Sequence, residues 1–206
     1  MDKKLYIDFA ENYHMNLVPN PSQNKLWVLA ACMAMPTLLG LKLGLTAMCV
    51  WSIVSTAIVL IMGAFTKKLG NVEVLNNIGL YFGVGVSYSW VFIQLAVRKI
   101  GFVFYFNAAF AVALLAGLVI GIFYTKIKVK RGAFVPKKRR QSRWFGAIGA
   151  ALAFIATKLI EHFVGIDIFV ILIAIVGYVL VFYGVPRLVL LCFQYYLLKK
   201  HRLVLK

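Results

Sequence analysis

Residues 26–65 form an almost uninterrupted apolar run in which Lys42 is the only charged residue. A helix needs about 20 apolar residues to cross the hydrocarbon core of a bilayer, because that core is ~30 Å thick and a helix rises ~1.5 Å per residue. The run is therefore too long for one crossing and long enough for two. Glycines on both sides of Lys42 favour a tight turn there, so we predict helices at about 26–41 and 45–65.

The composition of the whole chain excludes an ordinary soluble fold. Of 206 residues, 63% are hydrophobic and only 14% are charged, whereas a soluble domain carries about 25% charged residues. So few charges cannot cover a globular surface with polar groups, so the surrounding solvent must be lipid. We expect one membrane domain with no second folded unit.

The rest of the chain contains four more runs of spanning length. They lie at about 77–97, 100–124, 144–163 and 166–186. The six runs form three successive pairs. Within each pair a very short turn with a glycine joins the two runs, and short connections force antiparallel neighbours. The sequence therefore predicts an all-α integral membrane protein with six transmembrane helices in three tight hairpins.

Polar residues inside the predicted spans are few. The first helix is short and contains Pro36, which predicts a kink or a half-helix that re-enters the membrane. Gln94 and Asn107 lie near the outer end of the middle hairpin, where they can bond each other or backbone carbonyls. The other polar residues deep in the spans are Ser52, Ser55, Thr56, Ser87 and Ser89.

The charges predict how the chain is oriented. Lys and Arg total 23 against six Asp and Glu, and six spans place both termini on the same side. On that side lie all the basic residues except Lys42, Arg98, Lys99 and Lys158. Basic residues accumulate on the cytoplasmic side of membranes, so both termini are expected in the cytoplasm, at a plasma or inner membrane.

The loop 125–143 between the fourth and fifth predicted spans is the most basic segment. It satisfies the positive-inside rule, and each basic residue near an anionic lipid surface contributes about 1 kcal/mol. Docking of an acidic partner protein is the alternative, and the scarcity of interleaved aromatic residues disfavours nucleic acid. The candidate docking and lipid-binding residues are Lys126, Lys128, Lys130, Arg131, Lys137, Lys138, Arg139, Arg140 and Arg143.

Two segments flank the predicted membrane domain 26–186. Residues 1–25 mix Tyr6, Phe9 and Tyr13 with acidic residues, which suits a short cytoplasmic helix on the membrane surface or against a partner. In the tail 187–206, an 11-residue apolar run is followed by KKHR. The run is too short to span, so we expect an amphipathic helix in the interface, or a partner-binding helix.

Small residues spaced four apart predict where helices approach closely, because lipid provides no hydrophobic drive for helix association. Two such stripes lie on the neighbouring third and fourth predicted spans. They indicate that the middle hairpin is the tightly packed centre, within one protomer or between copies. The stripes are Gly79, Gly83 and Ser87 on one helix, and Ala109, Ala113, Gly117 and Gly121 on the other.

One group of ionisable residues lies at the outer end of the last predicted hairpin. Lys158, Glu161 and His162 share a helix face, and Asp167 follows just across the turn. They predict an ion-paired cluster that either closes the turn, with Lys158 extending outward, or forms a proton or ion site at an outer mouth.

No motif for catalysis, metal binding or a cofactor is present, so an enzyme is not expected. The first hypothesis is a non-enzymatic subunit that oligomerises or docks a cytoplasmic or membrane partner through its basic face, as in secretion, defence or multi-subunit transport assemblies. The alternative is a stand-alone small-solute transporter or channel. A weaker alternative is an immunity protein against a membrane-active toxin.

Overall fold

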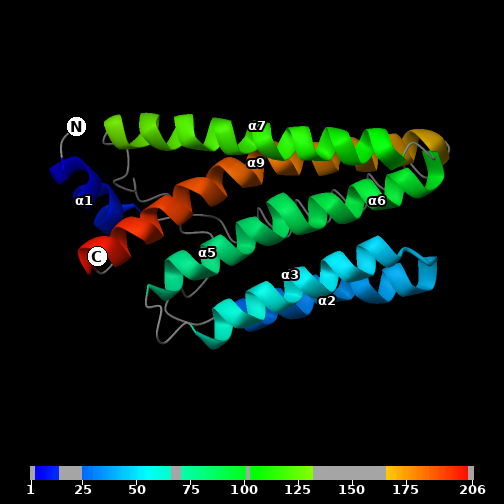
Figure 1. Cartoon of the computed structure of the whole chain (residues 1–206), viewed down its shortest axis with the longest axis horizontal. Helices are drawn as coiled ribbons and strands as arrows, with labels where there is room; N and C mark the ends of the chain where they lie inside the picture. Colours follow the sequence, from blue (N-terminus) through cyan, green and yellow to red (C-terminus); the bar gives the residue numbers. More distant parts are fainter. Residues whose placement is uncertain (1–2, 14–24, 66–70, 101–102, 132–165, 204–206) are drawn as a thin grey trace, which may run out of the picture.

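The computed structural model describes residues 3–13, 25–65, 71–100, 103–131 and 166–203, and every regular element in these ranges is helical. Five of the described helices are long and apolar enough to cross a membrane. They lie alongside one another in an elongated bundle (Figure 1). The described part of the chain is thus an all-helical bundle compatible with a membrane location.

The first apolar run folds into the two helices expected of it. α2 spans Leu26–Leu43 and α3 spans Thr46–Ala64. Gly44 ends α2 with φ of 68°, a left-handed conformation that glycine adopts without strain, and its N–H bonds to the carbonyl of Leu41. α2 continues through Pro36 as a single helix, so it contains no break into two half-helices.

The next crossing begins earlier than the sequence predicts. α5 (Val72–Phe82), the π-helix η1 (Gly83–Tyr88) and α6 (Ser89–Ile100) follow one another without a break. The extra turn at the start is stable because Asn76 is fully buried and its side-chain oxygen accepts the backbone N–H of Lys25 at 3.0 Å. The span is expected to begin at about residue 77, and burial against the start of α2 extends the helix back to Val72.

The last two described helices are both longer than predicted. α7 spans Val103–Lys130 and includes the first residues of the predicted basic loop. α9 spans Ile166–His201 and runs through Pro186, so the expected separate interfacial helix is instead a continuation of the last crossing. At 36 residues α9 is about 54 Å long, well beyond the ~30 Å of a hydrocarbon core.

α9 occupies the centre of the bundle. It packs against α1 (Lys3–Asn12), α5, η1, α6 and α7, whereas α6 and α7 touch each other much less. The sequence predicts the middle hairpin as the tightly packed centre, whereas among the described residues the contacts of α9 are the more extensive. Of the two alternatives for Gln94 and Asn107, the side-chain bond is present, since the Gln94 amide donates to the Asn107 oxygen at 2.9 Å.

Two glycines of α7 explain why that helix packs on α9. A Cβ atom at Gly117 would lie only 3.1 Å from Val185, and one at Gly121 would collide with Val189 at 2.8 Å. The β-branched valines of α9, spaced four apart, thus fill the groove that the glycines leave in α7. The small-residue stripe on α7 predicts a close approach, but the stripe alone does not say which helix approaches.

The closest approach of two backbones joins η1 to α9. A Cβ atom added at Gly85 would lie 2.8 Å from the Cα of Gly184, and one added at Gly184 would meet Gly85 in turn. Gly85 is not part of the stripe predicted on this span, whose glycines Gly79 and Gly83 lie against Leu26 and Met33 of α2. Ser87 is buried, Ala113 is buried and Ala109 is exposed.

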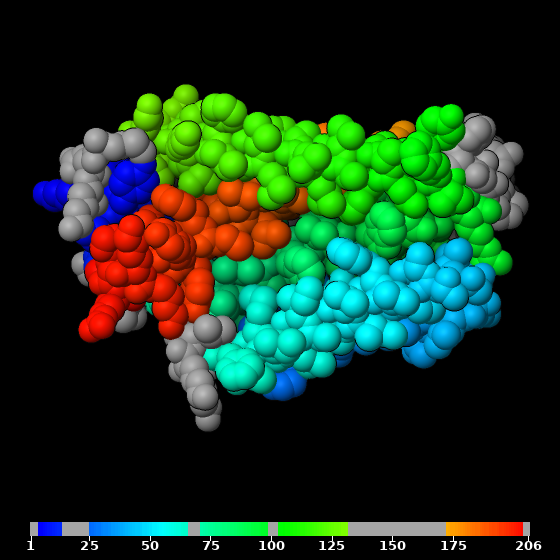
Figure 2. Space-filling model, viewed as in Figure 1, coloured from blue at the N-terminus to red at the C-terminus, as the bar shows by residue number. Residues whose placement is uncertain are grey.

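The α2–α3 hairpin forms a separate side of the bundle. Its two helices pack extensively on each other and only sparsely on α5, η1 and α6. Figure 2 shows the pair as a blue and cyan layer along one side of the molecule, away from α7. The predicted span 144–163, and with it the third hairpin, lies outside the described residues.

Candidate functional site

The described charges gather at one end of the bundle. Figure 1 shows that α1, the end of α9, the start of α5 and the end of α7 lie at this end, while the ends of α2 and α6 lie at the other. We call it the basic end, and its described basic residues are Lys3, Lys4, Lys25, Lys126, Lys128, Lys130, Arg131, Lys199, Lys200 and Arg202. Lys42, Arg98 and Lys99 lie at the opposite end.

Four of the predicted docking residues belong to the last turns of α7 and its end. Lys126, Lys130 and Arg131 are exposed, and Lys128 is partly exposed. The ammonium group of Lys128 lies 5.6 Å from the ring centre of Tyr124, one helical turn back. The other predicted docking residues, Lys137, Lys138, Arg139, Arg140 and Arg143, lie outside the described residues.

The N-terminal helix α1 is docked on the far end of α9. Gln194 is fully buried there, and its side-chain amide donates to the carbonyls of Ala10 at 3.0 Å and Tyr13 at 2.8 Å. These carbonyls lie at the end of α1, where the helix itself offers them no N–H. The predicted short N-terminal helix thus has a partner within the same chain.

The contact between α1 and α9 also covers apolar side chains. Phe9 is fully buried, and together with Tyr13 it packs on Leu190, Leu191 and Leu198 of α9. Figure 2 shows α1 in blue against the red end of α9. The apolar run that the sequence assigned to the membrane interface is therefore covered, at least on this side, by α1.

Burial also fixes the protonation state of Tyr13. Loss of contact with water raises the pKa of its phenol above the ordinary value of 10.0, the neighbouring Tyr124 adds to that effect, and Arg187 opposes it. A pKa raised by folding adds stability that is complete below pH 10 and is lost as the pH rises further. The docked α1 is therefore expected to be insensitive to pH in the neutral range.

A second group of polar side chains lies around Pro36. A proline has no N–H, so the carbonyl four residues earlier loses its helical donor. That carbonyl belongs to Cys32, and it accepts the hydroxyl of Tyr88 from η1 at 2.8 Å. The next carbonyl, of Met33, accepts the hydroxyl of Ser52 from α3. Side chains of two other helices thus supply donors to α2 beside the proline.

The same group extends along α3. The hydroxyl of Thr37 donates to that of Ser52 at 2.9 Å. One turn further on, the hydroxyls of Ser55 and Thr56 are buried and find no hydrogen-bond partner among the described residues. We call Thr37, Ser52, Ser55, Thr56 and Tyr88 the hydroxyl cluster. It is uncharged and lies near the middle of α2 and α3.

The side chains of the predicted outer ion-pair cluster lie outside the described residues. Lys158, Glu161 and His162 lie outside them, and Asp167 lies in the first turn of α9, where only the backbone is described.

Sequence reasoning missed Gln194, Tyr88 and Thr37 as functional candidates. A signal for Tyr88 and Ser52 did exist, because a proline inside a spanning helix requires donors from elsewhere. Nothing local predicts Gln194, whose partners lie more than 180 positions earlier in the chain.

No protein-family model matches this chain, and neither a curated protein nor a solved structure is similar to it. Function must therefore be argued from the basic end and the hydroxyl cluster themselves.

Proposed function

We propose that the protein is a non-enzymatic membrane subunit that docks an acidic partner protein through its basic end. The observation that supports this most is the length and packing of α9. The helix has about 16 residues more than a bilayer crossing needs, and α1 is fixed to this excess by Gln194. This extra length of α9 is structured and ends in basic residues. It is not needed to cross the membrane, but it suits protein recognition.

In this proposal the basic end faces the cytoplasm, as the positive-inside rule requires. The partner presents acidic side chains to the exposed Lys130, Arg131, Lys199, Lys200 and Arg202. A second copy of the chain is a poor candidate for this contact, because two equally basic surfaces repel each other.

The test is neutralisation of one end at a time. Replacing Lys199, Lys200 and Arg202 by Gln should abolish recovery of a stoichiometric partner in native mass spectrometry of particles purified at native expression level. The matched control, Lys42→Gln with Arg98→Gln, removes charge from the opposite end and should leave the partner bound. If both variants retain the partner equally well, docking through the basic end is refuted.

A second candidate function, a small-solute transporter or channel, is favoured by the hydroxyl cluster. Buried hydroxyls without partners are costly in a membrane, and transporters build their sites from interrupted helices near the bilayer midplane. Here Lys158, Glu161, His162 and Asp167 would gate the opposite end. Flux in reconstituted vesicles should then fall in Ser52→Ala and Ser55→Ala variants, and wild-type flux in both would exclude it.

A further inference from the structure

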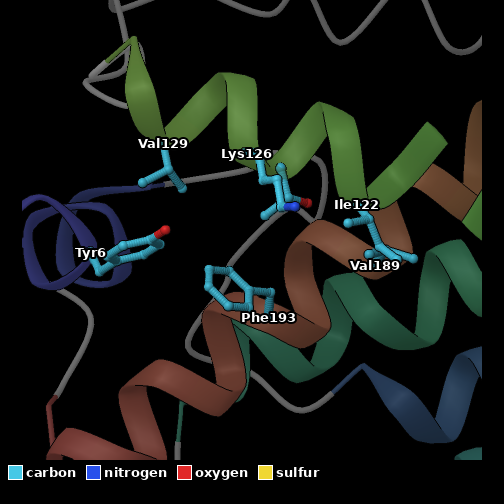
Figure 3. A pocket seen from close by; sticks show the side chains of 7 residues that line it. Tyr6, Ile122, Lys126, Val129, Val189 and Phe193 are labelled. Atoms are coloured by element: carbon cyan, nitrogen blue, oxygen red, sulfur yellow. The ribbon is translucent and has the colours of Figure 1, made fainter. Parts of the chain in front are cut away.

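A cavity of about 180 Å³ opens between α1, α7 and α9 near the basic end. Figure 3 shows Tyr6 entering from α1, Ile122, Lys126 and Val129 from α7, and Val189 and Phe193 from α9. The rings of Tyr6 and Phe193 meet edge to face with centres 5.9 Å apart. Thr125 completes the described lining, in which no residue is acidic.

The chemistry of the lining selects an apolar occupant. The hydroxyl of Thr125 already donates to the carbonyl of Gly121 at 2.8 Å, so it offers no donor to the cavity. Most of the wall is aliphatic or aromatic. The volume is below the ~300 Å³ at which pockets begin to enclose drug-sized ligands. The cavity therefore suits one segment of a longer molecule, such as part of an acyl chain.

The position of Lys126 adds an anionic group to that description. Residues 103–125 of α7 carry no charge, and Lys126 is the first charged residue after them. That uncharged stretch is about long enough to cross the hydrocarbon core. Lys126 and the cavity therefore lie where acyl chains meet headgroups. Lys130 and Arg131, both exposed, follow one turn further out.

We propose that this cavity holds an acyl-chain segment of an anionic phospholipid from the surrounding bilayer, with the lipid phosphate paired to Lys126. Apolar walls take the chain, and a cation at the rim takes the headgroup. A bound lipid would join α1 to α7, two helices that otherwise touch each other little. The inference rests on the membrane location in the proposed function and not on the docking of a partner.

The experiment measures lipid binding to the purified full-length chain by native mass spectrometry. Phosphatidylglycerol and phosphatidylcholine with identical acyl chains are titrated separately. The wild-type chain should retain one phosphatidylglycerol more tightly than phosphatidylcholine. Lys126→Gln should reduce that preference about five-fold, the factor that one basic residue contributes near an anionic surface. Ile122→Trp should fill the cavity and weaken both lipids alike.

The matched control is Lys130→Gln, which removes an exposed charge from the same helix but not from the cavity wall. It should change the preference much less than Lys126→Gln does. Equal effects of the two variants would show general attraction to a basic surface and would overturn the proposal. So would unchanged binding in an Ile122→Trp variant that elutes as the same monodisperse particle, because another segment or molecule would then occupy the cavity.

The outcome of this experiment is independent of the test of the proposed function, because the lipid titration contains no partner protein. Partner recovery from native membranes can succeed while specific lipid retention fails. Lipid retention can likewise succeed while partner recovery fails.

Discussion

The two helix-interior prolines are accommodated in opposite ways. At Pro36 the carbonyls of Cys32 and Met33 accept hydroxyls from η1 and α3, so donors from other helices stabilise α2 beside the proline. Near Pro186 the guanidinium of Arg187 donates to the carbonyl of Tyr183 at 2.9 Å, within the same helix. The side-chain bonds near Pro36 therefore tie helices together, whereas the one near Pro186 stays within α9.

The packing around each proline matches this contrast. α9 is held by close backbone contact, with Gly184 on Gly85 and with Pro186 beneath Gly121. The α2–α3 hairpin touches the rest of the bundle sparsely, and the bonds of Tyr88 to Cys32 and of Lys25 to Asn76 are among its few links. We infer a rigid centre around α9 and a more readily displaced hairpin, a division that mutations can test.

The largest effect is expected at Gly184. The Cβ of Gly184→Ala would collide with the backbone of Gly85, which has no flexible side chain to move aside. We expect a loss of at least about 3 kcal/mol of stability in detergent, the upper end of typical overpacking costs. Thermal unfolding measures it, with Val179→Leu, an exposed position of α9, as the near-neutral control. A stable Gly184→Ala variant would show that the centre is not rigid.

Next in size is the release of α1 from the far end of α9. Gln194→Leu keeps the volume and removes both bonds to the end of α1, so docking should weaken by about 1 to 2 kcal/mol. Hydrogen exchange of residues 3–13 should become faster while the rest of α9 stays protected. Cys192→Ala, at an exposed position of the same helix, should change nothing. Unchanged exchange in α1 would mean that apolar contacts alone hold it.

A double-mutant cycle tests the account of Pro36. Tyr88→Phe orphans the carbonyl of Cys32 and should cost about 1 kcal/mol, within the range of single hydrogen bonds in membrane proteins. In a Pro36→Ala background the restored N–H can serve the same carbonyl, so Tyr88→Phe should cost clearly less. Equal costs in the two backgrounds would show that Tyr88 does not compensate for the proline.

The smallest effect is expected at Arg187, whose bond to the carbonyl of Tyr183 is exposed and lies within α9. Its guanidinium lies 3.7 Å from the ring centre of Tyr183. Arg187→Lys keeps the charge but loses the planar stacking, and should cost about 0.5 kcal/mol. Chemical unfolding in detergent measures this. A loss as large as that of Gly184→Ala would place Arg187 in the rigid centre.

The sequence predicts what depends on composition and local pattern. The run 26–65 with its central Lys42 predicts the α2–α3 hairpin. The two helices follow from the length of the run, and the turn follows from the glycines on both sides of Lys42. Of the small residues named on α7, Gly117 and Gly121 lie close to α9, whereas Ala109 is exposed. The bond between Gln94 and Asn107 could be predicted because few polar groups lie near that level of the two helices.

The sequence does not predict which helix packs against which. A stripe with Gly117 and Gly121 fits any ridge of β-branched residues, and only the assembled bundle selects α9. The last crossing is expected to end at residue 186, but α9 continues through Pro186, and its close packing on Gly121 of α7 is not visible locally. The hydroxyl cluster needs three helices to form, and its members are scattered serines, threonines and a tyrosine in the chain.

The central claim is that the basic end projects from one side of a membrane and the two turns from the other. Single cysteines at positions 4, 130 and 199 and at positions 42 and 98, in a chain with its three native cysteines replaced, can be labelled in sealed vesicles with an impermeant reagent. We predict that the first three react only from the cytoplasmic face and the last two only from the opposite face. Reaction of positions 42 and 199 from the same face would contradict the account.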